Sequence, residues 1–551
     1  MECWRVHRKT MWKRHPKSTA QRQASCEPQY LCPAPANPST DLPYPSPMKP
    51  RWNLFAYFLV LALGVWLGIA LQSRRRINQG LLSKWEWMQQ LIQAHYVDAI
   101  PRDSLEVSAL QPLLSGLDPF SSYLPPVEKQ AAEEALEGNF EGIGVEFNLQ
   151  QDSIRVVSAL PGGPSDAAGI RSGDRIVTVN DKPVPGKGLT NEWVLKRLRG
   201  PRGTKVRLGL YRPSWNKVFH CVVTRDKIAL KSVDLAWWPA PGVAHVRINK
   251  FGAQTHRECV EALRTLQNQG PIKRLILDLR GNPGGYLESA VELADEFLPG
   301  RVLITYTQGE HQPRRDYYTQ REGLFEKGSL LVLLDQGSAS ASEILAGALN
   351  DHDRATLIGE RTFGKALVQQ QFEYQDGSAV RLTVARYYTP RGVCIQKPYH
   401  LLHGDSPSVR DSGGIAPDLR VASAFAGYSP ALTLLMESGL LYEEALRFAE
   451  TPEAQALKQG GQDAYFRQFR WAEPQIRRWA QRTLLSPERS TPAATAPNDL
   501  QTKLGPSELD ALALTFKAQL GRLLFGNALY FKVMAAADPV VAAAVQWKAR
   551  P

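Results

Sequence analysis

Apolar strand-like runs and amphipathic helix-like runs alternate between residues 227 and 425. The runs GVAHVRINKF, KRLILDLRGN and SLLVLLDQG predict buried strands, and THRECVEALRTLQNQ, LESAVELADEFL and ASEILAGALND predict helices. Such a βαβ rhythm is typical of a mainly parallel sheet covered by helices, so we expect an α/β core. The glycine-rich turns GNPGG and QGSAS each follow a predicted strand and precede a helix, which is where active sites gather in such folds.

The rest of the 551-residue chain divides into segments with different patterns. We expect a disordered basic, Pro-rich tail at 1–51, an apolar anchor at 52–72, a helical region at 73–137, a small β-rich domain at 138–226, the core at 227–425 and a helix-rich extension at 426–551. The extension is expected to act as a scaffold.

The anchor prediction rests on LFAYFLVLALGVWLGIAL, 18 residues without a charge. A helix of that length spans roughly 27 Å, close to the hydrocarbon thickness of a bilayer. A cleaved signal peptide and a buried core helix are alternative interpretations, and Met48 is an alternative translation start.

The net charge of +12 is unevenly placed, because residues 1–51 hold nine Lys or Arg against three Asp or Glu. The remainder shows no basic patch with interleaved aromatic residues, so no nucleic-acid partner is expected. The six cysteines form no CxxC pair and no His/Cys cluster, so no metal site is expected either.

The stretch QGSASASEILAG offers three serines at a predicted strand-to-helix turn. A serine at a helix N-terminus benefits from free N–H groups that stabilise an oxyanion, but it needs a base. Lys365, in an apolar and glycine setting, and His352, among charged residues, are both candidate bases. The residue types alone leave the two alternatives open.

Four blocks, LDLRGNPGG, GSASASEILAGALND, IGERTFGKALVQQ and RYYTPRG with GGIAPD, together resemble the carboxy-terminal processing peptidases of the Bacteroidetes type. The resemblance implies a crotonase-like (ClpP/crotonase) α/β core interrupted by a PDZ domain. It implies that Ser340 is the nucleophile, Lys365 the base and Gln369 the residue that orients the lysine, while Ser338 and Ser342 shape the turn and cap the helix. It implies oxyanion donors at the backbone N–H groups of Gly284, Gly285 and Ala341.

The segment GPSDAAGIRSGDRIVTVND resembles a PDZ domain, following the Gly-rich run EGIGVEF. Backbone N–H groups that converge in such a run can hold a terminal carboxylate. The peptide-binding residues are expected to be Gly142, Ile143, Gly144 and Val145. As a hypothesis, Arg199 couples the ligated PDZ domain to the catalytic centre.

Together these features predict a membrane-anchored serine endopeptidase that acts without a cofactor on envelope proteins recognised by their C-terminus. The family habit places the catalytic domain in the periplasm, on a single-pass inner-membrane anchor. An adaptor or a second copy is a candidate partner of the extension. Phe120 stands where many relatives have His, and this departure is not expected to affect catalysis.

Two alternative functions remain. A trypsin-like PDZ protease would explain the faint likeness of GNPGG to GNSGG, but position 283 is Pro and the PDZ segment comes first. A catalytically inactive PDZ-type adaptor would not need Ser340, Lys365 and Gln369 together.

Overall fold

The computed structural model describes residues 57–67, 84–150, 153–160, 162–401, 404–405, 413–422, 429–484 and 504–548. These form two compact units, Met1–Ala99 and Ile100–Pro551, which are treated separately. The described part of the first unit consists of the helix Tyr57–Leu67 and α2 (Lys84–His95).

The predicted anchor at 52–72 is described only at its centre, where Tyr57–Leu67 is helical, and its two ends lie outside the described residues. Within the described ranges, no single helix is long and apolar enough to cross a membrane. The pair α16 (Asn527–Ala536) and α17 (Pro539–Gln546) would suffice by length and composition, but it is bent by 68°. The predicted disordered tail at 1–51 lies outside the described residues.

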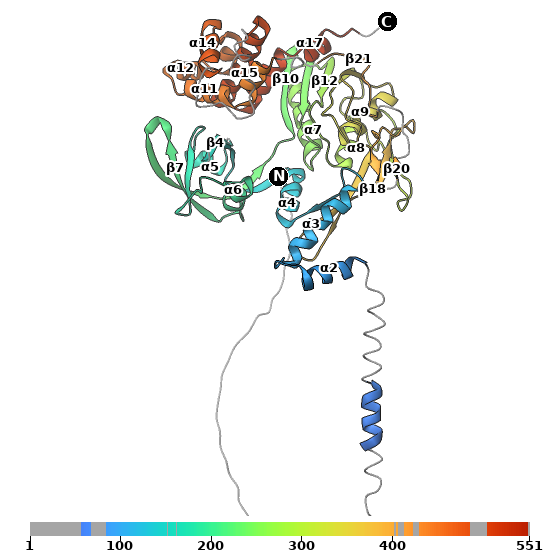
Figure 1. The fold of residues 1–551 in the computed structure, drawn as a ribbon. Helices are drawn as coiled ribbons and strands as arrows, with labels where there is room; N and C mark the ends of the chain where they lie inside the picture. The colour runs from blue at the N-terminus through green and yellow to red at the C-terminus, as the bar shows by residue number, and fades with distance from the viewer. Residues whose placement is uncertain are drawn as a thin grey trace, which may run out of the picture. The chain divides into compact units, whose positions relative to one another are not determined.

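The second unit is built around one six-stranded sheet (Figure 1). Its strand order is β10 (Val233–Ala240), β11 (Val243–Ile248), β12 (Arg274–Asp278), β15 (Ser329–Leu334), β16 (Thr356–Gly359) and β21 (Leu419–Arg420). All neighbours from β11 to β21 are parallel, and β10 is antiparallel to β11. The crossover helices are α7 (Thr255–Gln269), α8 (Leu287–Asp295) and α9 (Ala341–Asp351), so the predicted α/β core is confirmed.

The two faces of this sheet are covered by different parts of the chain. Because side chains alternate along a strand, Leu275 and Leu277 pack with α7, α8 and α9, whereas Ile276 faces the other way. That second face packs against α16 and α17, through side chains that include Val540 and Val541. The C-terminal extension therefore supplies one layer of the α/β core as well as a domain of its own.

A second, mainly antiparallel sheet flanks the core. Its strands are β1 (Ser122–Leu124), β18 (Ala379–Tyr388), β13 (Leu303–Gln308) and β14 (Arg315–Tyr318), with β17 (Leu367–Glu373) also paired to β18. The region 73–137 was predicted to be helical, and α2, α3 (Arg102–Ser115) and α4 (Pro126–Glu137) agree. The exception is β1, whose three residues are too few to show a strand period.

The segment between α4 and β10 forms a separate β-rich domain. Its sheet has the order β3 (Val145–Gln150), β4 (Ser153–Ala159), β5 (Arg175–Val179), β7 (Lys205–Arg212) and β8 (Lys217–Thr224), with the short β6 (Lys182–Pro183) on β5. The helix α6 (Asn191–Leu198) packs on it through Val194 and Leu198. Because β1 precedes this domain and pairs with β18 after it, the domain is an insertion in the core fold.

The C-terminal extension opens with a helical bundle before it reaches the core sheet. The bundle consists of α10 (Pro430–Glu437), α11 (Leu440–Ala449), α12 (Pro452–Gln459), α13 (Gln462–Gln468), α14 (Glu473–Leu484) and α15 (Pro506–Phe525). It has its own aromatic core around Phe516. It also touches the inserted domain, where Tyr442 Oη donates to Val157 O at 2.7 Å and Arg155 pairs with Glu443 at 3.1 Å.

Candidate active site

Ser340 lies at the turn between β15 and α9, as predicted. Its φ of 55° and ψ of −114° are unusual for a residue other than glycine, and such strain is concentrated at functional sites. The turn is tight: a Cβ at Gly284 would come within 2.8 Å of Ser340 Cβ. The Ser340 side chain lines a pocket.

The neighbouring serines tie the turn to the glycine-rich loop. Ser338 Oγ donates to Leu279 O at 2.9 Å, and Ser342 Oγ donates to Asn282 O at 3.0 Å. Both side chains are buried. The prediction that they shape the turn is confirmed, but neither caps α9, because each hydroxyl is directed at the loop that follows β12.

Lys365 lies in the loop before β17 and lines the same pocket of about 610 Å³ as Ser340. Its Nζ donates to Gln369 Oε1 at 3.0 Å, so the structure brings Lys365 and Gln369 together as predicted. Burial lowers the pKa of Lys365, and the nearby Arg381 lowers it further, which favours the neutral amine that a general base requires. In this structure the amine of Lys365 donates its hydrogen bond to Gln369 and not to Ser340.

Phe120, which stands where many relatives have His, contacts this lysine. Its ring lies under Lys365 Nζ, with the nitrogen 4.5 Å from the ring centroid. Its backbone carbonyl accepts a 2.6 Å hydrogen bond from Gln369 Nε2, which leaves Gln369 Oε1 turned toward the lysine. Phe120 reaches this lysine because β1 pairs with β18 and carries the preceding turn next to Lys365. That Phe at this position does not affect catalysis stays a prediction.

Glu343 joins the serine turn to the lysine loop, and sequence reasoning did not assign it a role. Its fully buried carboxylate accepts hydrogen bonds from Ser340 N–H at 2.9 Å, Lys365 N–H at 2.9 Å, Gly364 N–H at 2.8 Å and Thr362 Oγ1 at 2.5 Å. Burial raises the pKa of Glu343 despite these hydrogen bonds. The signal was present in the sequence, because a Ser followed three residues later by Glu is a capping pattern.

Tyr387 is a second residue that sequence reasoning missed. Its hydroxyl donates to Lys365 O at 2.8 Å and to Ser340 O at 3.2 Å, and burial raises its pKa well above the ordinary value. It therefore stays a neutral donor that fixes the backbone of both residues. No sequence signal marked it, because it depends on β18 passing beneath the site.

The predicted oxyanion donors are not equivalent. Gly284 N–H is already used, because it donates to Asn282 Oδ1 at 2.9 Å. In the described part of the chain, Gly285 N–H and Ala341 N–H have no acceptor, and both belong to the turns that meet at Ser340. Gly285 and Ala341 are therefore the better candidates, while Gly284 is needed for its close approach at a φ of 95°.

The alternative base lies too far away. His352 is the residue that ends α9, twelve positions after Ser340, which corresponds to roughly 18 Å along a helix. Its Nε2 donates to Leu303 O at 2.7 Å. The geometry therefore removes His352 from the choice that the sequence left open.

The predicted carboxylate-binding run lies at an edge of the inserted domain. Gly144 adopts a left-handed φ of 72°, and β3, which starts at Val145, is paired only with β4. Gly144 N–H has no acceptor among the described residues, and Gly142 ends the strand β2 (Asn139–Gly142) and bridges to Arg199. Free N–H groups beside an open strand edge can take the terminal carboxylate of an added peptide strand.

Arg199, at the end of α6, forms an ion pair with Glu134 on α4 and lies over the Phe140 ring. The residue before Glu134 on α4, Glu133, accepts a 2.6 Å hydrogen bond from Gln371 Nε2 and lines the pocket of Ser340. Arg199 is therefore separated from the candidate active site by one helix.

Comparisons with known proteins bear on these residues. The model described as peptidase family S41 matches residues 242–421, and the model described as PDZ domain matches residues 155–212. The chain is 36% identical over 343 residues to a carboxyl-terminal-processing protease of Picosynechococcus sp., which covers 60% of this chain and 75% of that protein. It is 33% identical over 373 residues to a probable CtpA-like serine protease of Staphylococcus aureus, with 67% and 70% covered. Among solved structures, the photosystem II D1 C-terminal processing protease matches with 29% identity over 62% of this chain and 87% of that one, at a TM-score of 0.34.

Proposed function

This chain belongs to peptidase family S41 and is a carboxyl-terminal-processing serine protease with a PDZ domain, and we propose that Ser340 is its nucleophile and Lys365 its general base. One observation carries the proposal. The two side chains line one pocket, and the carboxylate of Glu343 binds the backbone N–H of both residues. The core is proposed to be of the crotonase-like type.

The mechanism is acyl transfer. Neutral Lys365 takes the hydroxyl proton of Ser340, whose Oγ attacks the scissile carbonyl carbon. Gly285 N–H and Ala341 N–H stabilise the resulting oxyanion. Protonated Lys365 gives its proton to the leaving amine as the C–N bond breaks. Water, deprotonated by Lys365, then hydrolyses the ester and returns Ser340 to its hydroxyl form.

The lysine must gain a second partner during this cycle. Its Nζ is bonded to Gln369 Oε1 in the structure, and its long side chain has to rotate toward Ser340 Oγ to accept the proton. Gln369 is itself held by the Phe120 carbonyl. The amine of Lys365 can then donate one hydrogen bond to Gln369 Oε1 while its lone pair accepts the proton of the Ser340 hydroxyl. No step requires a metal or an organic cofactor.

The inserted PDZ domain is proposed to select substrates by their C-terminus. The support is the free N–H group of Gly144 beside the unpaired edge of β3. The ion pair from Arg199 to Glu134 is the proposed route from peptide binding to the active site. If Arg199→Ala leaves peptide-stimulated turnover unchanged, this route is excluded.

The apolar segment at 52–72 is proposed to anchor the enzyme in the inner membrane, with the protease in the periplasm acting on envelope proteins. Cell fractionation tests this: full-length chain should resist extraction by alkaline carbonate and be digested by protease added to spheroplasts. Release by carbonate, or protection in intact spheroplasts, would contradict it.

The dyad is tested on the full chain, purified in detergent, with fluorescein-labelled β-casein as an unfolded substrate. Ser340→Ala and Lys365→Ala are expected to lose cleavage, because each removes a reacting group, while His352→Gln keeps it. Cleavage that survives Lys365→Ala at neutral pH would exclude the dyad, and cleavage that survives Ser340→Ala would exclude the nucleophile.

A further inference from the structure

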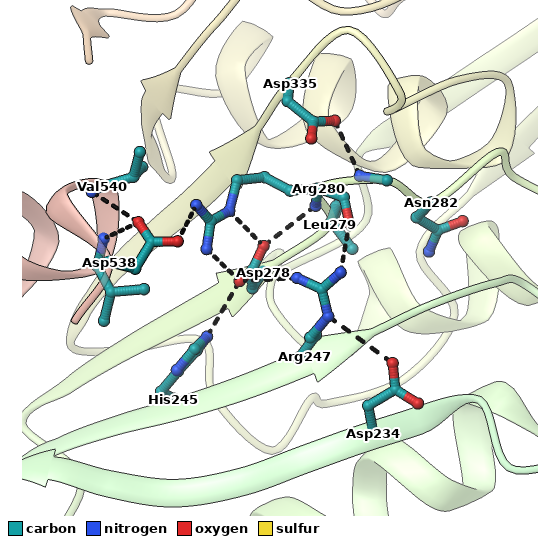
Figure 2. A network of polar contacts seen from close by, with 12 residues as sticks. Asp234, His245, Arg247, Asp278, Leu279, Arg280, Asn282, Asp335, Asp538 and Val540 are labelled. Atoms are coloured by element: carbon teal, nitrogen blue, oxygen red, sulfur yellow. Dashed lines mark hydrogen bonds and ion pairs between the residues drawn. The ribbon is translucent and has the colours of Figure 1, made fainter. Parts of the chain in front are cut away.

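Arg280 begins the loop that leads to the candidate oxyanion donor Gly285. It lies two residues after the end of β12 and is bound to the last residue of that strand: its Nε and Nη2 donate to the two oxygens of Asp278 at 2.9 and 2.8 Å. The next residue, Gly281, donates its N–H to Asp335 Oδ1 at 2.8 Å (Figure 2). The start of the loop is therefore fixed by polar contacts, and any displacement of Arg280 is passed on to the donors that follow.

A second carboxylate reaches Arg280 from the C-terminal extension. Arg280 Nη1 donates to Asp538 Oδ2 at 2.8 Å, and the two side chains are 12% and 19% exposed (Figure 2). The other oxygen of Asp538 accepts from Val540 N–H at 2.8 Å and Val541 N–H at 3.3 Å, so it caps α17. One side chain thus starts the last helix and pairs with the arginine of the glycine-rich loop.

The helix that carries Asp538 is held on the core at both ends. Val540 and Val541 are buried against the second face of the sheet. At the far end, Arg274 Nη1 donates to the carbonyl oxygens of Ala544 and Val545 at 3.2 and 2.8 Å. This anchoring makes Asp538 a fixed partner, because the carboxylate cannot move away without breaking apolar packing.

We propose that Asp538 is a positioning residue for catalysis: through Arg280 it holds the glycine-rich loop so that Gly285 N–H meets the oxyanion. The inference rests on the proposed role of Ser340 and gives the C-terminal extension a part in the catalytic step. Asp278 binds one edge of the guanidinium and Asp538 binds the other nitrogen, so Arg280 is held between the core strand and the extension.

The variant Asp538→Asn separates the two tasks of this side chain. Its Oδ1 can still cap α17, but its amide NH₂ then faces Arg280 and removes the charge partner. Because Asp278 still neutralises the arginine, we expect the fold to be retained and the loop to be displaced. A displacement of a fraction of an ångström is expected to lower kcat about tenfold. Asp538→Ser, which keeps a cap but does not reach Arg280, should give the same loss.

The measurement is kcat and KM for the full chain with labelled β-casein, together with the Ki of a peptide aldehyde. The aldehyde forms a hemiacetal with Ser340 whose oxygen occupies the oxyanion position. We expect kcat to fall and Ki to rise by about the same factor of ten while KM changes less than twofold. A merely structural role would lower the melting temperature without moving kcat and Ki together.

Two controls match the change. Asp463→Asn removes the partner of Lys532 elsewhere in the extension, at 3.4 Å, and should leave kcat unaltered. Arg274→Met loosens the other end of α17 without touching Arg280 and should lower stability more than kcat. If Asp538→Asn behaves like Asp463→Asn, or Arg274→Met loses as much kcat, the proposal is overturned. Cleavage by Ser340→Ala would instead overturn the proposed function itself.

Discussion

Two buried carboxylates stand behind the candidate catalytic loops, and their surroundings are opposite. Glu343 receives hydrogen bonds from neutral donors only, three backbone N–H groups and the Thr362 hydroxyl. Asp278 faces the guanidinium groups of Arg280 and Arg247 and the ring of His245. Burial raises the pKa of Glu343, whereas at Asp278 the same effect is outweighed and the arginines hold the pKa well below its ordinary value.

The difference shows how the two halves of the site are organised. The loops of Ser340 and Lys365 are joined locally, by a carboxylate three residues after Ser340. The loop that leads to the candidate oxyanion donor Gly285 is held by ion pairs from distant segments, β11 through Arg247 and α17 through Asp538. Charge pairs fix the direction of a guanidinium, while neutral hydrogen bonds fix the course of a backbone.

The largest effect is expected from Asp278→Asn. It leaves the partly buried Arg247 and Arg280 with one carboxylate fewer, and removing the buried partner of such a pair costs about 3 kcal/mol. The free energy of unfolding in urea should fall by that amount relative to the parent. A loss below about 1 kcal/mol would mean that Asp538 and water neutralise the arginines without Asp278.

Glu343→Gln should come next, at about 2 kcal/mol, because its NH₂ group meets N–H donors that then lack an acceptor. It should also slow cleavage about thirtyfold, since the turns of Ser340 and Lys365 are no longer joined. Stability and kcat measured on one preparation check both numbers. Unchanged kcat with lowered stability would show that Glu343 supports the fold alone.

The pH dependence of stability should have opposite signs for the two carboxylates. The folded pKa of Glu343 is raised above its ordinary 4.5, so its contribution is fully present below pH 4.5 and is lost as the pH rises through the folded pKa. The folded pKa of Asp278 is depressed, so its contribution is present above pH 3.8 and is lost as the pH falls.

Urea unfolding between pH 4 and 8 tests this sign difference. The stability advantage of the parent over Glu343→Gln should shrink as the pH rises from 4.5. The stability advantage of the parent over Asp278→Asn should stay constant between pH 4 and 8. If the two stability differences change with pH in the same way, the burial of Glu343 and the ion pairs of Asp278 do not shift the two pKa values in opposite directions.

The smallest effect is expected from Phe120→Leu. The ring face stabilises the charged amine of Lys365, which also faces Arg381, Asp118 and Glu343. Losing the ring should lower the pKa of Lys365 and move the acid limb of kcat/KM to lower pH by about 0.5 to 1 unit. Phe363→Leu, a neighbour in edge contact with Phe120, is the matched control and should not move the limb.

The sequence predicted the half of the site that is local in the chain. The segments expected to form α7, β12 and α9 do so, and the strand-to-helix turns of β12 and β15 meet, which brings Ser340 beside the glycine-rich loop. Both features follow from short-range periodicity and from the parallel arrangement that it implies.

The parts that could not be predicted depend on long-range pairing. Phe120 reaches Lys365 because β1 pairs with β18, more than 250 residues later in the chain. A strand of three residues is too short for its sequence to predict such a pairing. Asp538 reaches Arg280 because the last helix covers the second sheet face. An apolar Ala-rich helix predicts burial but does not reveal which surface it will cover.

The central claim, that Lys365 is the base of Ser340, is tested most directly by the pH dependence of kcat/KM in the parent and in His352→Gln. A base must be neutral, so activity should rise with pH along an acid limb below the ordinary lysine pKa of 10.5. We predict that the acid limbs of the parent and of His352→Gln coincide, and that Lys365→Ala is inactive over the whole pH range. A limb that vanishes in His352→Gln while Lys365→Ala stays active would contradict the account.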